Sequence, residues 1–306
     1  MIYLELEGRI GNQLFMYAAA RTLQLRSNEP TEIVIDDRLV KRVNWENSLV
    51  HYELPEGVRF VSDNKIIRQM DLLRARWDMF KYHHFVTRMH RDYRSRYNFE
   101  VAKREEYQSH GLVRCENGYI PLPESVDRDI YMSGYFQSEK FFLDNREEIK
   151  KIYRIEDEVK KSGYPGLDKI QNRNSVCISI KVEHNVGNQM YDVCTREYWE
   201  KAIQYIIDNV ENPLFFICSD NVPYVLEHFI DADKYDVVFQ SRDYPVHISL
   251  AVMAQCKHFI IGNTSFGWWA QYLSDNEDKI VITPSRWYGI DVPCDLYMDN
   301  WTSIDV

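Results

Sequence analysis

The N-terminal stretch MIYLELEGRIGNQLFMYAAARTLQLRSNEPTEIVID, residues 1–36, decides the fold class. Residues 1–7 alternate apolar and acidic side chains, which is typical of a strand with one buried face. After the glycine-bearing loop 8–11, apolar residues recur at helical spacing over 12–26, and TEIVID at 31–36 has the pattern of a second strand. A strand, a loop, a helix and a strand in this order predict a parallel α/β sheet with crossover helices.

The second half of the chain repeats this alternation. Apolar segments of strand length are separated by segments of about ten residues with helical spacing, which predicts parallel strands covered on both faces. The strand segments are SVCISI (175–180), LFFICSD (214–220), 235–239, HFIIGNTS (258–265) and KIVITP (279–284). We therefore predict two Rossmann-like, doubly wound domains that face each other across a ligand-binding cleft.

The length of the chain supports two domains, since 306 residues are about twice a domain of roughly 150 residues. The segment SGYPGLDKIQNRN at 162–174 carries glycine and proline and is the best linker candidate. We place the boundary there, with an N-terminal domain at 1–165 and a C-terminal domain at 166–306. A basic stretch at about 64–106 has helical character and is interpreted as an insertion into the N-terminal domain.

The composition argues against several classes of protein. Residues 1–7 carry acidic side chains where a signal peptide would be apolar, and no segment approaches the roughly 18 uninterrupted apolar residues of a membrane span. The six cysteines are scattered without a CxxC pair, as is usual for free thiols in a reducing cytoplasm. The formal net charge of −10 argues against nucleic acid as a partner. We therefore expect a cytoplasmic protein.

Charge is unevenly distributed along the chain. Residues 65–104 contain eleven Lys and Arg against four Asp and Glu, interleaved with aromatic residues. Two interpretations stay open: a solvated helical face, or a surface that contacts anionic lipid or an anionic acceptor such as a lipid diphosphate. The second interpretation would place the protein peripherally at the inner face of a membrane.

Four polar loops follow predicted strands, where ligands bind in parallel α/β sheets. They are GRIGNQ (8–13), KVEH (181–184), Ser219-Asp220 and GNTSFGWW (262–269). Glycines let the backbone approach a ligand closely, and helix N-termini favour phosphate. Helix capping and core packing are the structural alternatives for the same residues. A ligand site is favoured because several of these loops fall on the same edge of one predicted sheet.

Several longer blocks resemble one known family. GRIGNQLFMYAAARTLQ (8–24) resembles the opening GxxGNQxFxYAxxRxL signature of the family 11 glycosyltransferases, the α-1,2-fucosyltransferases. DIYMSGYFQSEKFF (129–142) resembles their central block, and FFICSDNVPYV (215–225) their Phe-Ser-Asp-Asp block. MAQCKHFIIGNTSFGWWAQYL (253–273), with KIVITPSRWY (279–288) after it, resembles their last conserved block. These blocks span most of the chain in the family's order.

The resemblance implies a fold and an activity. It implies GT-B architecture, with two Rossmann-like domains, the donor held mainly by 166–306 and the acceptor mainly by 1–165. It also implies an inverting transferase that needs neither a metal nor a cofactor. The donor would be the nucleotide sugar GDP-fucose, and the acceptor a galactoside hydroxyl of an oligosaccharide or a lipid-linked glycan.

One motif departs from the family. Family members carry His-x-Arg-Arg-x-Asp where this chain has SIKVEH (179–184), so the first cationic position is kept as Lys181 and the second arginine has become Val182. An arginine holds phosphate through two geometrically matched hydrogen bonds, which valine cannot make. Losing one charged hydrogen bond costs about 1.5–3 kcal/mol, roughly a ten- to hundredfold change in affinity or rate.

Residue roles follow from the single displacement that the resemblance implies. The leaving diphosphate needs cations and helix amides that already point at it. We assign donor binding around the diphosphate to Gly11, Asn12, Gln13, Lys181, Asn263, Thr264 and Ser265. Ser219 and Asp220 are assigned to the nucleoside. Glu183 and His184 are candidate general bases by position, and a protonated His184 would replace the missing arginine. An ion pair between Lys181 and Glu183 is the structural alternative.

Three rival functions stay open. The first is a glycosyltransferase that uses another donor sugar or nucleotide, and the second is a non-catalytic sugar- or nucleotide-binding relative. The third is a metal-dependent transferase of the other common glycosyltransferase fold, suggested by Asp127-Arg128-Asp129 and Asp231-Ala232-Asp233. Neither triplet directly follows an apolar strand, which argues against this third function.

Overall fold

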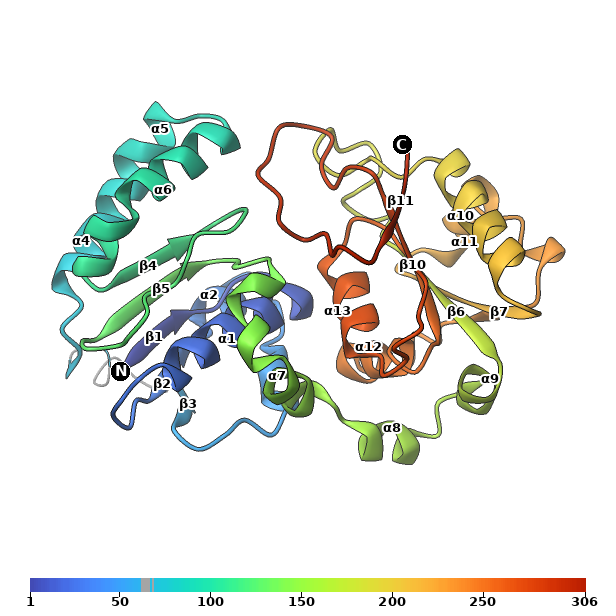
Figure 1. The fold of residues 1–306 in the computed structure, drawn as a ribbon, viewed down its shortest axis with the longest axis horizontal. Coiled ribbons are helices and arrows are strands. Elements are labelled where there is room, and N and C mark those ends of the chain that lie inside the picture. Colours follow the sequence, from blue (N-terminus) through green and yellow to red (C-terminus); the bar gives the residue numbers. More distant parts are fainter. Residues whose placement is uncertain (62–66, 68) are drawn as a thin grey trace. The chain divides into compact units, whose positions relative to one another are not determined.

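A computed structural model describes residues 1–61, 67 and 69–306 of the chain (Figure 1). The chain forms two compact units. The first comprises Met1–Ile152 with Asp291–Leu296, and the second comprises Tyr153–Ile290 with Tyr297–Val306. A short segment near the C-terminus therefore belongs to the first unit. A division of the chain at one point of the sequence cannot describe this arrangement.

The segment predicted as a linker, 162–174, lies within the second unit. It contains helix α9 (Leu167–Asn172) and leads directly into strand β6 (Asn174–Ile180). Ile170 is fully buried, and its carbonyl oxygen accepts a hydrogen bond of 2.6 Å from the Ser175 hydroxyl. The change of unit comes earlier, next to Tyr153, whose ring packs edge-on against Trp269 at 5.2 Å. The segment is therefore held in the second unit by buried contacts, although its glycine and proline content is typical of a linker.

The first unit is built on a five-stranded sheet in the order β3-β2-β1-β5-β4, and every neighbouring pair is parallel. The predicted strand–loop–helix–strand opening is confirmed as β1, α1 and β2. The elements of this unit are β1 (Ile2–Glu5), α1 (Ile10–Leu25), β2 (Ile33–Asp36), α2 (Arg38–Arg42), β3 (Val58–Phe60), α4 (Leu73–Lys81), α5 (Thr87–Met89), α6 (Tyr93–Ser109), β4 (Leu112–Cys115), β5 (Ile130–Gly134) and α7 (Arg146–Tyr153). Helix α1 is buried over most of its length, because apolar and small residues cover almost all of its faces.

The helical segment predicted at about 64–106 is helical from Leu73 to Ser109, with a break at 90–92; residues 62–66 and 68 lie outside the described part. It connects β3 to β4, which are the two opposite edge strands of the sheet. It is therefore a crossover connection rather than an insertion. Apolar residues of α4 and α6 pack against the sheet in one core cluster, which includes Ala75, Met79, Tyr107, Tyr3 and Tyr131.

The second unit has a six-stranded parallel sheet in the order β11-β10-β9-β6-β7-β8. Strand β6 lies in its interior, and its apolar run is buried because helices cover both faces. Val176, Ile178 and Ile180 pack with Trp199 and Ile203 of α10 in one core cluster. The elements of this unit are α8 (Glu156–Ser162), α9, β6, α10 (Arg196–Asn209), β7 (Pro213–Ser219), α11 (Val222–His228), β8 (Val237–Phe239), α12 (Val246–Met253), β9 (His258–Ile261), α13 (Ser265–Leu273), β10 (Val281–Pro284) and β11 (Thr302–Ile304).

The two parallel sheets confirm the predicted α/β class. Among the residues that the structure describes, no helix combines the length and apolar character needed to cross a membrane. All six cysteines are free.

Candidate active site

Three of the four predicted loops leave the same edge of the second sheet. Strands β6, β7 and β9 are parallel neighbours, and the register places Ile180 opposite Ser219 and Ser179 opposite Ile261. The residues that follow these strands therefore emerge side by side at the carboxyl edge. The predicted convergence of 181–184, Ser219-Asp220 and 262–265 is confirmed.

Asp220 connects the ends of β6 and β7. Its carboxylate forms an ion pair with the Lys181 ammonium and accepts a 2.8 Å hydrogen bond from the Val182 amide. The Asp220 carbonyl oxygen accepts a hydrogen bond of 2.9 Å from Nη1 of Arg242. Lys181 pairs with Asp220 and not with Glu183, the alternative considered from the sequence, and Asp220 also satisfies the Val182 amide, two residues beyond β6. The carboxylate predicted to contact the nucleoside is thus already engaged within the chain.

Lys181 is accessible to a ligand despite its partner. Its side chain is 26% exposed and that of Asp220 is 19% exposed. A diphosphate at this edge would meet an ammonium whose charge is partly neutralised by the neighbouring carboxylate. The net attraction at Lys181 is therefore weaker than that of an unpaired arginine.

Val182 occupies a core position. It is buried and packs in the cluster that contains Ile180 and Tyr198. The family's second motif arginine has therefore been replaced by a residue that stabilises the sheet, and the side chain is directed away from any ligand at the edge.

Glu183 and His184, the predicted general-base candidates, are both exposed. His184 adopts a left-handed backbone conformation with φ of 68°. Neither side chain forms an ion pair or hydrogen bond within the described part of the chain. Their position beyond β6 is as predicted, but no neighbouring side chain orients either of them.

The loop after β9 positions the N-terminus of α13. The Thr264 hydroxyl caps this helix by accepting a hydrogen bond of 3.0 Å from the Gly267 amide, and Ser265 is its first residue. A Cβ atom at Gly267 would lie 2.9 Å from the Ser179 hydroxyl, so glycine lets the first turn of α13 lie directly against β6. The helix amides are thereby held at the edge where a phosphate would bind.

Asn263 braces this loop from within. It is buried, and its side-chain amide donates hydrogen bonds of 3.0 Å and 2.9 Å to the carbonyl oxygens of Tyr191 and Trp287. Its side-chain amide is engaged within the chain, and direct donor binding by Asn263 stays a prediction. Its side chain fixes two neighbouring loops that lie in the same unit.

Two cations at this edge were missed by the sequence analysis. Arg242 follows β8, and Arg286 follows β10. Both are exposed, and Arg286 makes no ion pair with the described residues. Both follow predicted strands, 235–239 and 279–284, and Arg286 also lies within the family-like block 279–288, whereas Arg242 belongs to no recognised motif. Together with Lys181 they give the carboxyl edge three cationic side chains.

The fourth loop, 8–13, lies in the first unit. Gly8 has φ of +72°, and a Cβ there would lie 2.5 Å from the Asn12 side-chain nitrogen. Gly11 and Asn12 lie in the first turn of α1, whose N-cap residue makes no side-chain capping bond. The Asn12 side-chain oxygen accepts a 2.8 Å hydrogen bond from Gln137, which connects the opening signature to the central block.

Gln13 braces the 8–13 loop through its side chain. It is fully buried, and its amide nitrogen donates hydrogen bonds of 2.8 Å to the carbonyl oxygens of Gly8 and of Glu46. Its oxygen accepts a 2.8 Å bond from the Ser48 amide. These bonds use both polar ends of the side chain, and a donor contact through Gln13 stays a prediction.

Carboxylates gather at the carboxyl end of β1. Burial raises the pKa of Glu5 and of Glu7, with the neighbouring Glu5 charge adding to the effect on Glu7. Glu5 accepts a 2.9 Å hydrogen bond from the Tyr131 hydroxyl, whereas Glu7 has no hydrogen-bond partner among the described side chains. Glu7 directly precedes the 8–13 loop, and the sequence analysis did not select it.

The Asp-x-Asp triplets are engaged elsewhere. Asp129 binds the N-terminal ammonium at 2.7 Å, and Asp127 pairs with Arg128 at 3.0 Å. Asp231 pairs with Lys234 at 3.0 Å. In the described ranges, no group of three or more His, Cys, Asp or Glu side chains is arranged to hold a metal ion.

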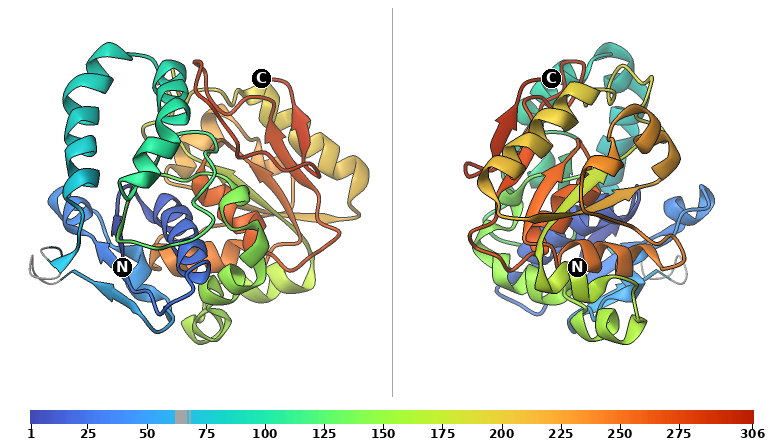
Figure 2. Two further views of the ribbon diagram at one scale, coloured as in Figure 1. Left: turned by 60° about the vertical axis from the view of Figure 1, so that its left-hand side comes forward. Right: turned by 90° about the vertical axis from the view of Figure 1, so that its right-hand side faces the viewer.

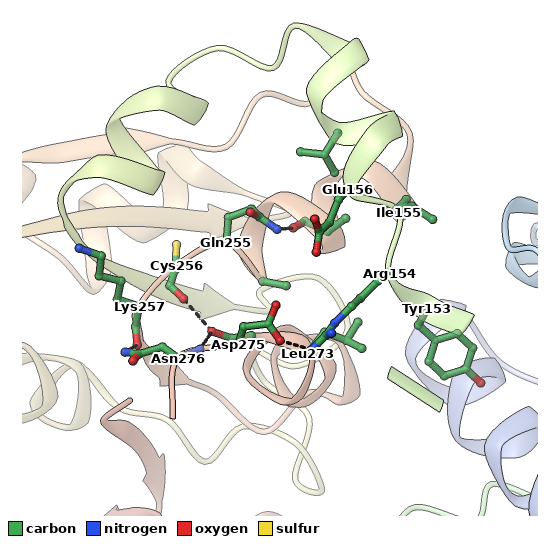
Figure 3. A pocket seen from close by; sticks show the side chains of 14 residues that line it. Tyr153, Arg154, Ile155, Glu156, Gln255, Cys256, Lys257, Leu273, Asp275 and Asn276 are labelled. Carbon is green, nitrogen blue, oxygen red and sulfur yellow. Dashed lines mark hydrogen bonds and ion pairs between the residues drawn. The ribbon is translucent and has the colours of Figure 1, made fainter. Parts of the chain in front are cut away.

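A cavity of about 210 Å³ lies away from the candidate site (Figure 3). Its lining includes residues just before β9 and just after α13, so it lies near the amino edge of the second sheet. The ion pair between Arg154 and Asp275 forms part of its wall. The predicted donor residues do not line it, and it is therefore separate from the candidate active site.

Two parallel sheets with converging strand-end loops are the framework of nucleotide-binding α/β enzymes. A model of glycosyl transferase family 11 matches residues 1–305, and the chain belongs to this family. It is therefore a glycosyltransferase.

Two curated relatives come from Escherichia coli. The chain is 25% identical over 315 residues to the O-antigen biosynthesis glycosyltransferase WbnK, covering 99% of this chain and 100% of that one. It is also 25% identical over 299 residues to an alpha-1,2-colitosyltransferase, covering 94% and 92% of the two chains.

Solved structures support the fold. The fucosyltransferase NodZ from Bradyrhizobium matches with a TM-score of 0.54 and 12% identity over 89% of this chain and 93% of that one. A structure of NodZ alpha-1,6-fucosyltransferase soaked with GDP-fucose matches with a TM-score of 0.53 and 12% identity over 95% and 99%. The predicted GT-B-like fold class is confirmed by this similarity and by the two parallel sheets.

Proposed function

We propose that the protein is an inverting α-1,2-fucosyltransferase, which moves fucose from GDP-fucose to a galactoside hydroxyl of an oligosaccharide or lipid-linked glycan. The observation that carries this proposal is the convergence of three strand-end loops, the α13 N-terminus and Lys181 at one edge of the second sheet. Such an edge suits the diphosphate of a nucleotide sugar. Membership of family 11 and the fold shared with a fucosyltransferase support the choice of donor.

In the proposed reaction the acceptor oxygen forms a bond to the anomeric carbon as the bond from that carbon to the phosphate oxygen breaks. The electron pair leaves with the diphosphate, and the hydroxyl proton passes to a general base. Lys181, the amides of α13 and the hydroxyls of Thr264 and Ser265 would stabilise the charge on the leaving group. Gly11 and Asn12, in the first turn of α1, are kept as proposed donor contacts. Ser219 and Asp220 would contact the nucleoside, the latter through backbone atoms.

Arg242 is proposed to compensate for Val182. Its guanidinium is anchored to the Asp220 carbonyl oxygen at 2.9 Å, which places it beside the Lys181–Asp220 pair. A second cation next to Lys181 restores the net positive charge that Asp220 removes. A planar guanidinium also supplies the fork of donors that binds phosphate.

The general base has three candidates. Glu183 and His184 lie beyond β6 but are exposed and unsupported. Glu7 lies beyond β1, its pKa is raised by burial, and unlike Glu5 it has no hydrogen-bond partner among the described side chains. We favour Glu7, on the unit to which the acceptor is assigned.

Another donor sugar is the second candidate function. The relative named alpha-1,2-colitosyltransferase, which matches 94% of this chain, favours it. A non-catalytic binding relative is the third alternative, and the retained α13 N-terminus and 8–13 loop argue against a decayed site.

Calorimetry with GDP, UDP, dTDP and CMP tests the proposal, followed by turnover of the matching nucleotide sugars. We expect GDP to bind and GDP-fucose to be consumed at full rate in excess chelator. Binding of only UDP or dTDP would transfer the proposal to another donor, and GDP binding without turnover of any GDP-sugar would overturn the enzymatic assignment. We place the protein in the cytoplasm, at the inner face of a membrane.

A further inference from the structure

One face of the helical crossover in the first unit carries large apolar side chains in solvent. Helix α4, the π-helical turn Tyr82–Val86 and α5 form one continuous rod, which is cyan in Figure 2. Five residues of this rod are exposed by the following fractions: Leu73 79%, Trp77 57%, Phe80 44%, Phe85 58% and Met89 78%. We call these five residues the exposed stripe.

The π-helical turn aligns the stripe. Its members are separated by four, three, five and four residues, and a step of five would turn Phe85 away from Phe80 in a regular α-helix. The wider π-helical turn accommodates one additional residue and brings Phe85 back toward the same face. His84 stacks on Phe80 at 4.0 Å and completes the aromatic surface beside Trp77. The π-helical turn therefore keeps the members of the exposed stripe on one face of the rod.

The opposite face of the rod is anchored in the core. Ala75, Met79 and Tyr82 are buried, and Ala75 and Met79 belong to the core cluster that packs against the first sheet. Because this inner face fixes the rod, its outer face is held in place without a partner inside the described chain. The exposed apolar area is therefore a preformed surface.

The surroundings of the stripe are basic. Residues 73–91 contain five Lys or Arg and one carboxylate, a difference of 5 − 1 = +4 in a chain whose net charge is −10. The carboxylate, Asp78, is buried and pairs with Lys81 at 3.3 Å and His110 at 2.6 Å. The remaining four basic residues are exposed and make no ion pair with described residues: Arg74, Arg76, Arg88 and Arg91.

We propose that the exposed stripe inserts into the interface of a bilayer that contains anionic lipid, while the arginines bind the headgroup phosphates. Aromatic and aliphatic side chains flanked by Arg and Lys are the composition of interfacial helices. The stripe spans 16 steps of 1.5 Å, about 24 Å, enough to lie along a membrane surface. A symmetric dimer is disfavoured, since two copies would set unpaired arginines against each other.

This surface would hold the enzyme where a lipid-linked acceptor is found, and that link rests on the proposed function. The lipid contact itself does not involve the donor edge. It is therefore measured without any nucleotide sugar, and its outcome is independent of the transfer reaction.

Flotation of the full-length chain tests the proposal with two sets of vesicles, pure phosphatidylcholine and phosphatidylcholine with phosphatidylglycerol. We expect binding to the anionic vesicles that weakens as salt is raised. W77S/F85S should bind at least about tenfold more weakly, because two apolar anchors are lost. R74Q/R88Q should bind about thirtyfold more weakly, since each basic residue near the surface contributes about 1 kcal/mol.

Matched controls remove similar groups from other faces. V50S/L143S removes two exposed apolar side chains, and K160Q/K161Q removes two exposed charges. Both should bind like the unmodified chain. All variants are first checked for an unchanged thermal transition, and transfer to a soluble galactoside is measured separately as the test of the enzyme.

Two results would overturn the inference. The first is a failure of the unmodified chain to bind anionic vesicles, or equal binding by the unmodified chain and W77S/F85S. The other is a dimer in sedimentation equilibrium that W77S/F85S abolishes while vesicles are not bound, because the stripe would then be an interface between copies. Loss of transfer with intact vesicle binding counts against the proposed function alone.

Discussion

Replacing Lys181 with alanine gives the most direct test of the donor site. A charged hydrogen bond to phosphate contributes about 1.5–3 kcal/mol, but Lys181 shares its charge with Asp220, so we take the lower end for its loss. The Asp220 carboxylate would then face the diphosphate without a partner. Over about 8 Å at an effective dielectric constant of about 20, this repulsion amounts to as much as about 2 kcal/mol. The sum, up to about 3.5 kcal/mol, predicts a loss of up to about four-hundredfold in GDP affinity.

The variant should remain folded. The ion pair is partly exposed, with side chains 26% and 19% accessible, so its contribution to the free energy of unfolding is about 1 kcal/mol or less. Asp220 keeps its 2.8 Å bond from the Val182 amide. Adding D220N to K181A removes the repelling charge while keeping an oxygen that accepts this bond. The double variant should therefore recover up to about thirtyfold in affinity.

Isothermal titration with GDP measures these affinities. K201A is the matched control, because Lys201 on α10 is exposed and pairs with Glu197 at 2.7 Å. It should bind GDP like the unmodified chain. Equal GDP affinity of K181A and K201A, with unchanged thermal transitions, would refute the assignment of Lys181 to the diphosphate.

Three further substitutions have definite expectations. V182R should lower the free energy of unfolding by about 3 kcal/mol without restoring donor affinity, since position 182 lies in the core; a thermal transition as high as the unmodified chain's would contradict this. N263A should cost about 1–3 kcal/mol of stability and weaken GDP binding, because two carbonyl oxygens of adjoining loops lose their donor; unchanged urea unfolding would count against the brace. E7Q should lower kcat about 10²–10⁴-fold if Glu7 is the base. The raised pKa of Glu7 means that the folded state holds this proton more tightly than the unfolded state, so its stabilising effect is present at low pH and is lost as pH rises through the folded pKa. E7Q should therefore be more stable than the unmodified chain at pH 7 and equally stable near pH 4, and the reverse order in chemical denaturation would be inconsistent with this pKa.

Burial separates the roles of neighbouring motif residues. Asn12 and Gln13 are adjacent in one signature, yet Asn12 pairs with Gln137 whereas Gln13 is enclosed and holds the loop shape. In the same way, Asn263 braces a loop, whereas its neighbour Thr264 caps a helix. A signature therefore contains residues that face a ligand and residues that fix the loop, and only contacts distinguish them.

The sequence alone determined the α/β class, the strands at 175–180 and 214–220, a strand with a turn at 258–265, and the edge at which their loops meet. These follow from periodicity and from the rule that parallel strands end at one edge, which are local or topological properties. The short edge strands β3, β4 and β11 were not predicted, whereas the equally short edge strand β8 falls within the predicted segment 235–239. A strand of three or four residues carries little periodic signal.

Only the tertiary structure decided which partners the charged and polar groups take. Asp220 reaches Lys181 across 39 residues of sequence, and Arg242 reaches the Asp220 carbonyl oxygen from a different strand end. The return of Asp291–Leu296 to the first unit is likewise a long-range contact. Such pairings depend on the packing of distant segments, and residue type or spacing along the chain does not encode them individually.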